Sequence, residues 1–129
     1  MRQRSEQITR GHRGLIAWEK GIELAVKVLD LCDAIPLRRG AGVVPQIRRS
    51  VISVPSNIAE GYDRPKGEYA SSVRIARGSL REVDTQLEIM LRRGTARTET
   101  ILALLCDADE LGRITSGLAD SIAAGGNSR

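Results

Sequence analysis

One apolar stripe constrains the fold of this chain more than any other feature of the sequence. Its residues recur in steps of three and four, at Tyr69, Val73, Ala76, Leu80, Val83, Leu87 and Met90. Steps of three and four keep side chains on one side of an α-helix, whereas a β-strand needs alternation of apolar and polar residues. The stripe therefore predicts a long helix with one buried face.

The segment before this stripe repeats the pattern and predicts a second helix. Its apolar residues step by four, three and four at Ile47, Val51, Val54 and Ile58. The two stripes can face each other across a glycine- and proline-containing loop at residues 61–67, so we expect an antiparallel helical hairpin.

Pro55 lies inside the first helix of this hairpin and is expected to kink it. Its ring removes a backbone donor and presses against the carbonyl of Val51. Ser53, Ser56 and Asn57 could bond the freed backbone groups, or could cap a fresh helical turn that starts at Pro55. The sequence leaves both alternatives open.

Two more helices are predicted outside the hairpin. The first spans residues 16–34 and stops before Pro36, and the last begins near Thr98, which is expected to cap it. The inner face of the first is expected at Trp18, Ile22, Ala25, Leu29 and Cys32. The inner face of the last is expected at Ile101, Leu104, Ala108, Leu111, Thr115, Leu118 and Ile122. Four helices result, so the predicted fold class is all-α.

The length of 129 residues suits one domain. We expect a flexible basic arm at residues 1–14, a helical bundle at 15–124 and a disordered tail at 125–129. The chain has no apolar run long enough for a membrane span and no apolar segment typical of a signal peptide, so the expected location is the cytoplasm.

Composition gives no sign of catalysis or of a bound cofactor. Cys32 and Cys106 are isolated in apolar helical contexts, which favours buried free thiols over a metal site or a disulfide. His12 is the only histidine, and it lies in the arm. With no catalytic triad, metal cluster or phosphate-binding glycine loop, we expect neither enzymatic activity nor a cofactor or metal.

Charge is distributed unevenly along the chain. Residues 1–15 hold four basic residues and one acidic residue, and residues 38–97 hold twelve basic and six acidic residues. Residues 16–34 hold two basic and four acidic residues, and residues 98–124 hold one basic and five acidic residues. The basic hairpin could pair with the acidic helices inside the bundle, or it could present a basic face to phosphate while the acidic faces meet neighbouring subunits.

Three arginines of the long helix form a second stripe. Arg74, Arg77 and Arg81 step by three and four, and like charges at that spacing repel. Arg81 has Asp84 three residues away, but Arg74 and Arg77 have no acid at three or four residues. Their counter-charge must come from another helix, another subunit, a bound anion or solvent.

Three runs of the sequence resemble a known family. They are Gln46-Ile47-Arg48-Arg49-Ser50, Ser53-Val54-Pro55-Ser56-Asn57-Ile58-Ala59-Glu60-Gly61 and Ile75-Ala76-Arg77-Gly78-Ser79-Leu80-Arg81-Glu82. The family is that of four-helix-bundle proteins encoded in intervening sequences of bacterial 23S ribosomal RNA genes, and the resemblance covers roughly residues 14–122. Leu15 stands where the family usually has Phe.

The resemblance implies an antiparallel up-down-up-down four-helix bundle that assembles into a homopentameric ring. A related accessory protein of diversity-generating retroelements binds nucleic acid and a reverse transcriptase through a basic surface. The resemblance also marks a set of motif positions without saying whether they bind, associate or pack, and we interpret as structural or oligomer residues Gln46, Asn57, Glu60, Gly61, Gly78, Ser79 and Glu82. Gly78 is interpreted as allowing close helix approach, and Asn57 and Glu60 as capping or pairing with Arg48 or Arg49.

Two functions compete. The first is a homo-oligomeric adaptor that binds RNA or DNA, with structured RNA or a duplex preferred because paired aromatics for base stacking are absent. Its candidate contacts are Arg48, Arg49, Arg64, Lys66, Arg74, Arg77 and Arg81. The alternative is a scaffold whose charged faces mediate only subunit or protein-partner contacts.

Overall fold

The computed structural model describes residues 11–125, and this part of the chain is helical with no strand, which confirms the all-α class. Its elements are η1 (Gly11–Gly14), α2 (Ile16–Asp33), α3 (Leu37–Gly40), α4 (Val44–Tyr62), α5 (Lys66–Arg93) and α6 (Thr98–Ala123). Most of the predicted arm and tail, residues 1–10 and 126–129, lies outside the described residues.

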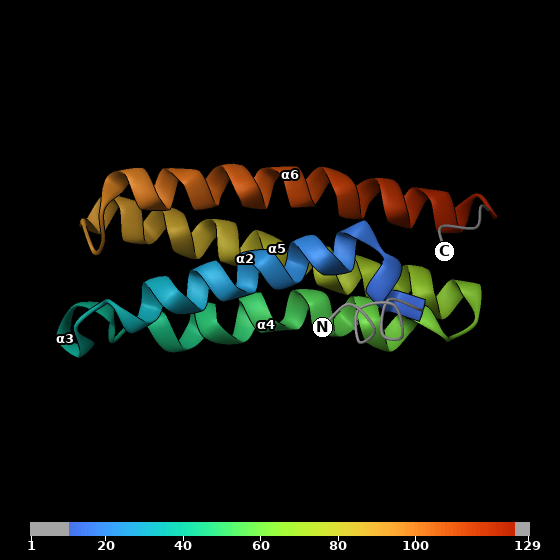
Figure 1. The fold of residues 1–129 in the computed structure, drawn as a ribbon, viewed down its shortest axis with the longest axis horizontal. Helices are drawn as coiled ribbons and strands as arrows, with labels where there is room; N and C mark the ends of the chain where they lie inside the picture. Colours follow the sequence, from blue (N-terminus) through green and yellow to red (C-terminus); the bar gives the residue numbers. More distant parts are fainter. Residues whose placement is uncertain (1–10, 126–129) are drawn as a thin grey trace, which may run out of the picture.

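Four long helices lie side by side along one axis (Figure 1). The chain colours show that successive long helices run in opposite directions. Helix α4 packs against α5, α5 against α6, and α2 against both α4 and α6. The hairpin predicted from the two stripes is therefore the α4–α5 pair, and α6 lies on the other side of α5.

The apolar stripes of α4 and α5 are buried as predicted. All four residues of the α4 stripe, from Ile47 to Ile58, are fully buried, and the seven residues of the α5 stripe are buried from Tyr69 to Met90. In α6 the predicted face is also buried except at Leu118, whose place in the core is taken by Ala119. Burial of these faces is the main stabilising contribution to the bundle.

The predicted inner face of α2 is confirmed at Ala25 and Cys32 and wrong by about one position at its other three residues. Its buried residues are Ala17, Gly21, Leu24, Ala25, Val28 and Cys32. Trp18, Ile22 and Leu29, which were expected inside, are only partly buried. The reason is close packing at Gly21, where an added Cβ would lie 3.3 Å from the Cβ of Pro55. Gly21 therefore brings the α2 backbone onto α4 and turns the bulkier neighbours to the flanks.

Helix α4 continues through Pro55, so the alternative in which a fresh helix starts there is not adopted. Ser56 Oγ donates to the carbonyl of Ile52 at 2.8 Å, and Asn57 Nδ2 donates to the carbonyl of Ser53 at 2.9 Å. Polar side chains next to the proline thus bond carbonyl groups of the preceding turn.

Residues 11–14, which the sequence assigned to the flexible arm, form a short 3-10 turn that packs against α2 and α4. The ring of His12 lies edge-on to Trp18 at 5.1 Å, and the guanidinium of Arg13 lies 5.1 Å from the same indole. Leu15 follows as a core residue. Apolar and aromatic contacts therefore hold this turn on the bundle.

Three local predictions need correction. The α4–α5 connection is shorter than residues 61–67, because α4 ends at Tyr62 and α5 begins at Lys66. Thr98 does not cap α6; Arg97 precedes the helix, and no side chain caps it. Cys106 is an exposed free thiol, whereas Cys32 is buried as expected, and burial raises the pKa of its thiol.

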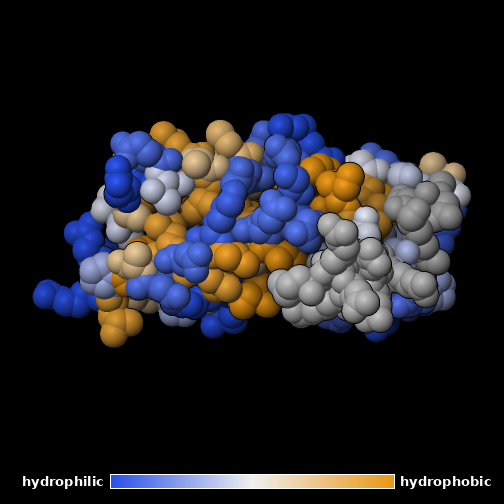
Figure 2. Space-filling view, in the orientation of Figure 1, coloured by the Kyte–Doolittle hydropathy of each residue, from blue (hydrophilic) through white to orange (hydrophobic). Residues whose placement is uncertain are grey.

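The surface carries both charged and apolar side chains. Figure 2 shows hydrophobic patches separated by a band of hydrophilic residues on the face seen in Figure 1. Between residues 11 and 125, no helix is long and apolar enough to cross a bilayer. Within the same residues, no group of His, Cys, Asp and Glu is arranged to hold a metal ion.

Candidate nucleic-acid interface

Three arginines of α5 carry charge that the described part of the chain does not neutralise. Arg74 and Arg81 are exposed and Arg77 is half-buried, and none of the three forms an ion pair with a described residue. Asp84, the expected local partner of Arg81, lies on the same groove but makes no ion pair with it. The counter-charge of the three guanidinium groups must therefore come from solvent, a bound anion or another subunit.

A groove between α5 and α6 brings two of these arginines together with an arginine of α6. Its volume is about 450 Å³. Helix α5 contributes Arg77 and Arg81, and α6 contributes Arg113 across the groove. The lining is completed by Leu80, Asp84, Ala108, Asp109, Gly112 and Ser116. Arg113 forms an ion pair with Asp109 one turn earlier, so this groove contains two unpaired guanidinium groups and one paired group.

Sequence reasoning missed Arg113 because it is the single basic residue of the most acidic helix. No local pattern in α6 marks it as part of a cationic site. The signal lies in the packing: the antiparallel neighbours α5 and α6 bring Arg113 opposite Arg77 and Arg81.

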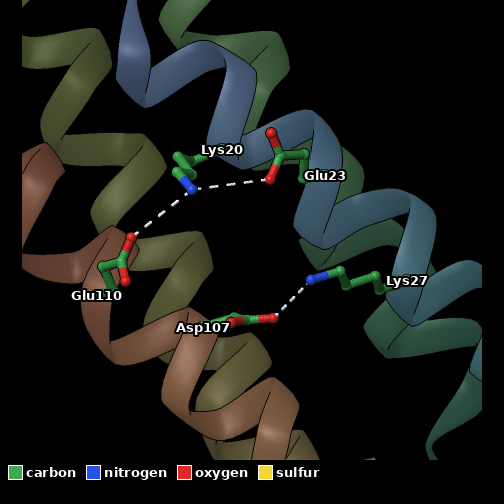
Figure 3. A network of polar contacts seen from close by, with 5 residues as sticks. All are labelled: Lys20, Glu23, Lys27, Asp107 and Glu110. Carbon is green, nitrogen blue, oxygen red and sulfur yellow. Dashed lines mark hydrogen bonds and ion pairs between the residues drawn. The ribbon is translucent and has the colours of Figure 1, made fainter.

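Two acidic residues of α6 pair with lysines of α2. Lys27 Nζ lies 3.1 Å from Asp107 Oδ2, and Lys20 Nζ lies 3.9 Å from Glu110 Oε1. Figure 3 shows these lysines reaching from α2 to α6, with Lys20 also 3.8 Å from Glu23. The two acidic helices are thus bridged by lysines of α2, and the arginines of α5 take no part in this contact.

The remaining predicted cations lie elsewhere on the molecule. Arg48 Nη2 donates to Asp33 Oδ1 of α2 at 2.9 Å, and this hydrogen bond raises the pKa of Arg48. Arg49 is exposed on α4 and forms no ion pair with a described residue.

At the α4–α5 turn, Arg64 pairs with Glu68 at 3.6 Å and donates from Nε to the carbonyl of Glu60 at 3.1 Å. Lys66 begins α5, and its ammonium lies beside Gly125 at the end of α6. The seven predicted cations therefore occupy at least three separate regions, and only Arg77 and Arg81 share a groove.

Several motif residues join α4 to α5. Asn57 Nδ2 donates to Ser53 Oγ at 2.9 Å, and the hydroxyls of Ser53 and Ser79 share a hydrogen bond of 2.8 Å. One helical repeat away, Ser50 Oγ makes a long 3.5 Å contact with Glu82 Oε1. Asn57 thus bonds Ser53 of its own helix, and the expected pairing with Arg48 or Arg49 is not among its hydrogen bonds.

The expected pairing of Glu60 with Arg48 or Arg49 is absent among the described residues, where Glu60 forms no ion pair. Gln46 lies on a hollow of about 540 Å³ beside the second half of α5. Its neighbours there include Val43 and Ile89, so Gln46 borders a largely apolar surface.

The two motif glycines have opposite surroundings. A Cβ added to Gly61 would lie 2.4 Å from the Cβ of Ser72, so Gly61 permits the close approach of α4 and α5. A Cβ added to Gly78 would have no described atom within 4 Å. The interpretation of Gly78 as a close-packing residue within the chain is therefore wrong, because this glycine faces outward.

A further cationic cluster lies at the α3 end of the bundle. Arg38, Arg39 and Arg93 line an open hollow of about 590 Å³ with Pro36. Arg39 Nη2 donates to the carbonyl of Gly94 at 2.6 Å, which ties this end of the bundle to the end of α5. The sequence gives no reason to place Arg93 beside Arg38 and Arg39, because Arg93 is more than fifty residues away along the chain.

Fold and site together define a class: a small helical-bundle protein with arginines gathered along one interhelical groove. The chain belongs to the family of 23S rRNA-intervening sequence proteins, because the model of that family matches residues 13–117.

A similar fold occurs in a crystal structure from Bacteroides thetaiotaomicron, described as a protein with unknown function from the S23 ribosomal protein family. The TM-score is 0.74 at 20% identity, covering 81% of this chain and 98% of that chain. Comparison with the curated proteins finds no match.

Proposed function

We propose that this protein is a non-enzymatic homo-oligomer that binds structured nucleic acid through phosphate contacts to α5. Its architecture in this proposal is an up-down-up-down four-helix bundle of residues 15–124, with α4 bent at Pro55, where a backbone donor is missing. The assembly in this proposal is the pentameric ring that the family resemblance implies.

The observation that carries the proposal is the unneutralised charge of α5. Arg74, Arg77 and Arg81 form no ion pair with residues 11–125. Guanidinium groups match phosphate oxygens in geometry and remain charged at all physiological pH values. Lysines of α2, and not these arginines, bind Asp107 and Glu110. Internal pairing between basic and acidic helices therefore leaves the α5 arginines available to a polyanion.

Binding to phosphates predicts a steep dependence on salt and little dependence on sequence. Each neutralised phosphate releases condensed counterions, so log affinity should fall linearly with log salt, with a slope of about −0.7 to −0.9 per contact. We expect this result in fluorescence anisotropy titrations of a structured RNA hairpin from 50 to 200 mM salt. Absence of binding at the lowest salt would contradict the proposal.

A second candidate function, a protein scaffold, is favoured by a different face of α5. Ile75, Gly78, Glu82, Thr85 and Ile89 step by three and four, so they share one side of the helix away from the core. Ile75 is 56% exposed and Ile89 is 44% exposed. Two motif residues, Gly78 and Glu82, lie on this α5 stripe, and an exposed glycine with no neighbour leaves room for the backbone of a second copy.

Disrupting this α5 stripe should dissociate the oligomer. The double change Ile75→Glu and Ile89→Glu would bury two charges in any subunit contact on the stripe, which is strongly unfavourable. Size-exclusion chromatography with light scattering should show the wild type as an oligomer and the variant as a folded monomer. Leu102→Glu is a matched control, since Leu102 is 47% exposed on α6. A monomeric wild type, or a variant that stays assembled, would rule out this interface.

A further inference from the structure

The groove between α5 and α6 has the chemistry of a phosphate site that extends beyond the predicted α5 arginines. We propose that it binds phosphate groups of the nucleic-acid backbone, with Arg113 and Ser116 of α6 as contacts opposite Arg77 and Arg81. This inference rests on the proposed function and adds the most acidic helix to the interface.

The first argument is the arrangement of donors. Guanidinium groups from both helices line a single groove of about 450 Å³, and with the carboxylates of Asp84 and Asp109 in the same lining the groove keeps a net positive charge. The hydroxyl of Ser116 lines it as well and makes no hydrogen bond to any described residue. Phosphate oxygens accept hydrogen bonds from both kinds of group, and planar guanidinium groups bind them in pairs.

The second argument is the side of α6 on which each of its charged side chains lies. Asp107 and Glu110 point to α2, where Lys27 and Lys20 neutralise them (Figure 3). The side of α6 that faces α5 carries Arg113, with Asp109 as its ion-pair partner. Both side chains of this pair are 70% exposed, and exposed pairs contribute little to stability. Arg113 can therefore exchange its contact with Asp109 for a phosphate.

The third argument is space. Gly112 has no side chain, and a Cβ there would lie 3.8 Å from Leu80 Cδ2, which is an ordinary contact. The groove is open at this position because the residue is glycine. A larger side chain would fill the groove without changing any charge, and leucine favours the helix more than glycine does.

Two variants test the inference against the same structured RNA hairpin. Gly112→Leu should weaken binding by about tenfold because its side chain occupies the space of the phosphate, and Arg113→Gln should reduce the magnitude of the salt slope by about one. Gly117→Leu is the steric control, since nothing described lies within 4 Å of a Cβ there. Arg97→Gln is the charge control, and thermal melts monitored by circular dichroism verify that all four variants fold.

The outcomes separate this inference from the proposed function. Loss of affinity in Gly112→Leu and Arg113→Gln, with both controls unchanged, supports the groove. If both variants bind as the wild type while reversing Arg74, which lies outside the groove, weakens binding, the groove proposal is wrong and the proposed α5 surface is retained. If the wild type itself does not bind the hairpin at low salt, both proposals fail.

Discussion

Reversing the charges of Arg74 and Arg77 together, by Arg74→Glu and Arg77→Glu, is expected to abolish binding to structured RNA without unfolding the protein. The change removes two guanidinium groups that have no ion-pair partner in residues 11–125, and it introduces two carboxylates that repel phosphate. Loss of two phosphate contacts alone reduces the salt slope by about 1.4 to 1.8. Added repulsion should bring the loss of affinity at 100 mM salt to about 100-fold or more.

The bundle should tolerate this double change. Arg74 is exposed and Arg77 half-buried, and neither forms an ion pair within the described chain that the substitution would break. Exchanging charges on such positions normally changes stability by about 0.5 kcal/mol or less. Melting temperatures measured by circular dichroism should therefore stay within a few degrees of the wild type.

A control with the same change in net charge makes this experiment specific. Arg92 and Arg97 are exposed arginines that pair with Glu88 and Glu99. Changing both to glutamate alters the total charge equally but leaves the α5–α6 groove intact. Equal loss of affinity in both double variants would point to net charge alone, and unchanged affinity of the Arg74 and Arg77 variant would remove this face from the interface.

Gly61→Ala is expected to lower the free energy of unfolding by about 1–3 kcal/mol, the usual range for overpacking. The new Cβ would lie 2.4 Å from the Cβ and 2.7 Å from the Oγ of Ser72, and 3.4 Å from the Cα of Tyr69. The Ser72 Cβ is attached to the backbone, so rotation of a side chain cannot relieve the contact and α4 must move away from α5. Urea denaturation followed by circular dichroism measures the loss.

Gly78→Ala is the matched control and should raise the free energy of unfolding instead of lowering it. Both glycines are helical and belong to the family motifs, but a Cβ at Gly78 meets no described atom within 4 Å. Alanine in an exposed helical position stabilises by about 0.5–1 kcal/mol relative to glycine. Adding Ser72→Gly should recover part of the stability lost in Gly61→Ala. A Gly61→Ala protein as stable as the wild type would show that the two helices do not need this close contact.

The helical faces of the hairpin could be read from the sequence because their periodicity is regular. The stripes from Ile47 to Ile58 and from Tyr69 to Met90 are buried where periodicity puts them. The face of α2 was misjudged because hydrophobicity favours Trp18 and Ile22, whereas the packing depends on the small size of Gly21 against Pro55. A glycine carries no hydropathy signal, so its contact with a proline on another helix is invisible to periodicity.

Some candidate site residues could likewise be identified from the sequence, whereas others could be placed only from the structure. Arg74 and Arg77 stand out in the sequence because no acid lies three or four residues from either of them. Arg48 looks equivalent in sequence, yet it bonds Asp33, which lies fifteen residues away on α2. Arg113 has an acid one turn earlier and looks satisfied, yet it lies on the same groove as Arg77 and Arg81.

The periodicity and the local charge pattern of the sequence are enough to predict helices, the apolar faces of α4, α5 and α6, and arginines of α5 without local partners. These properties depend on residues three and four positions apart, and a helix brings such residues together whatever surrounds it. Three contacts depend instead on how the helices pack: Gly61 against Ser72, the α2 lysines with Asp107 and Glu110 of α6, and Arg113 across a groove from Arg77. Those contacts join residues distant in sequence, and their geometry follows from how the helices pack together.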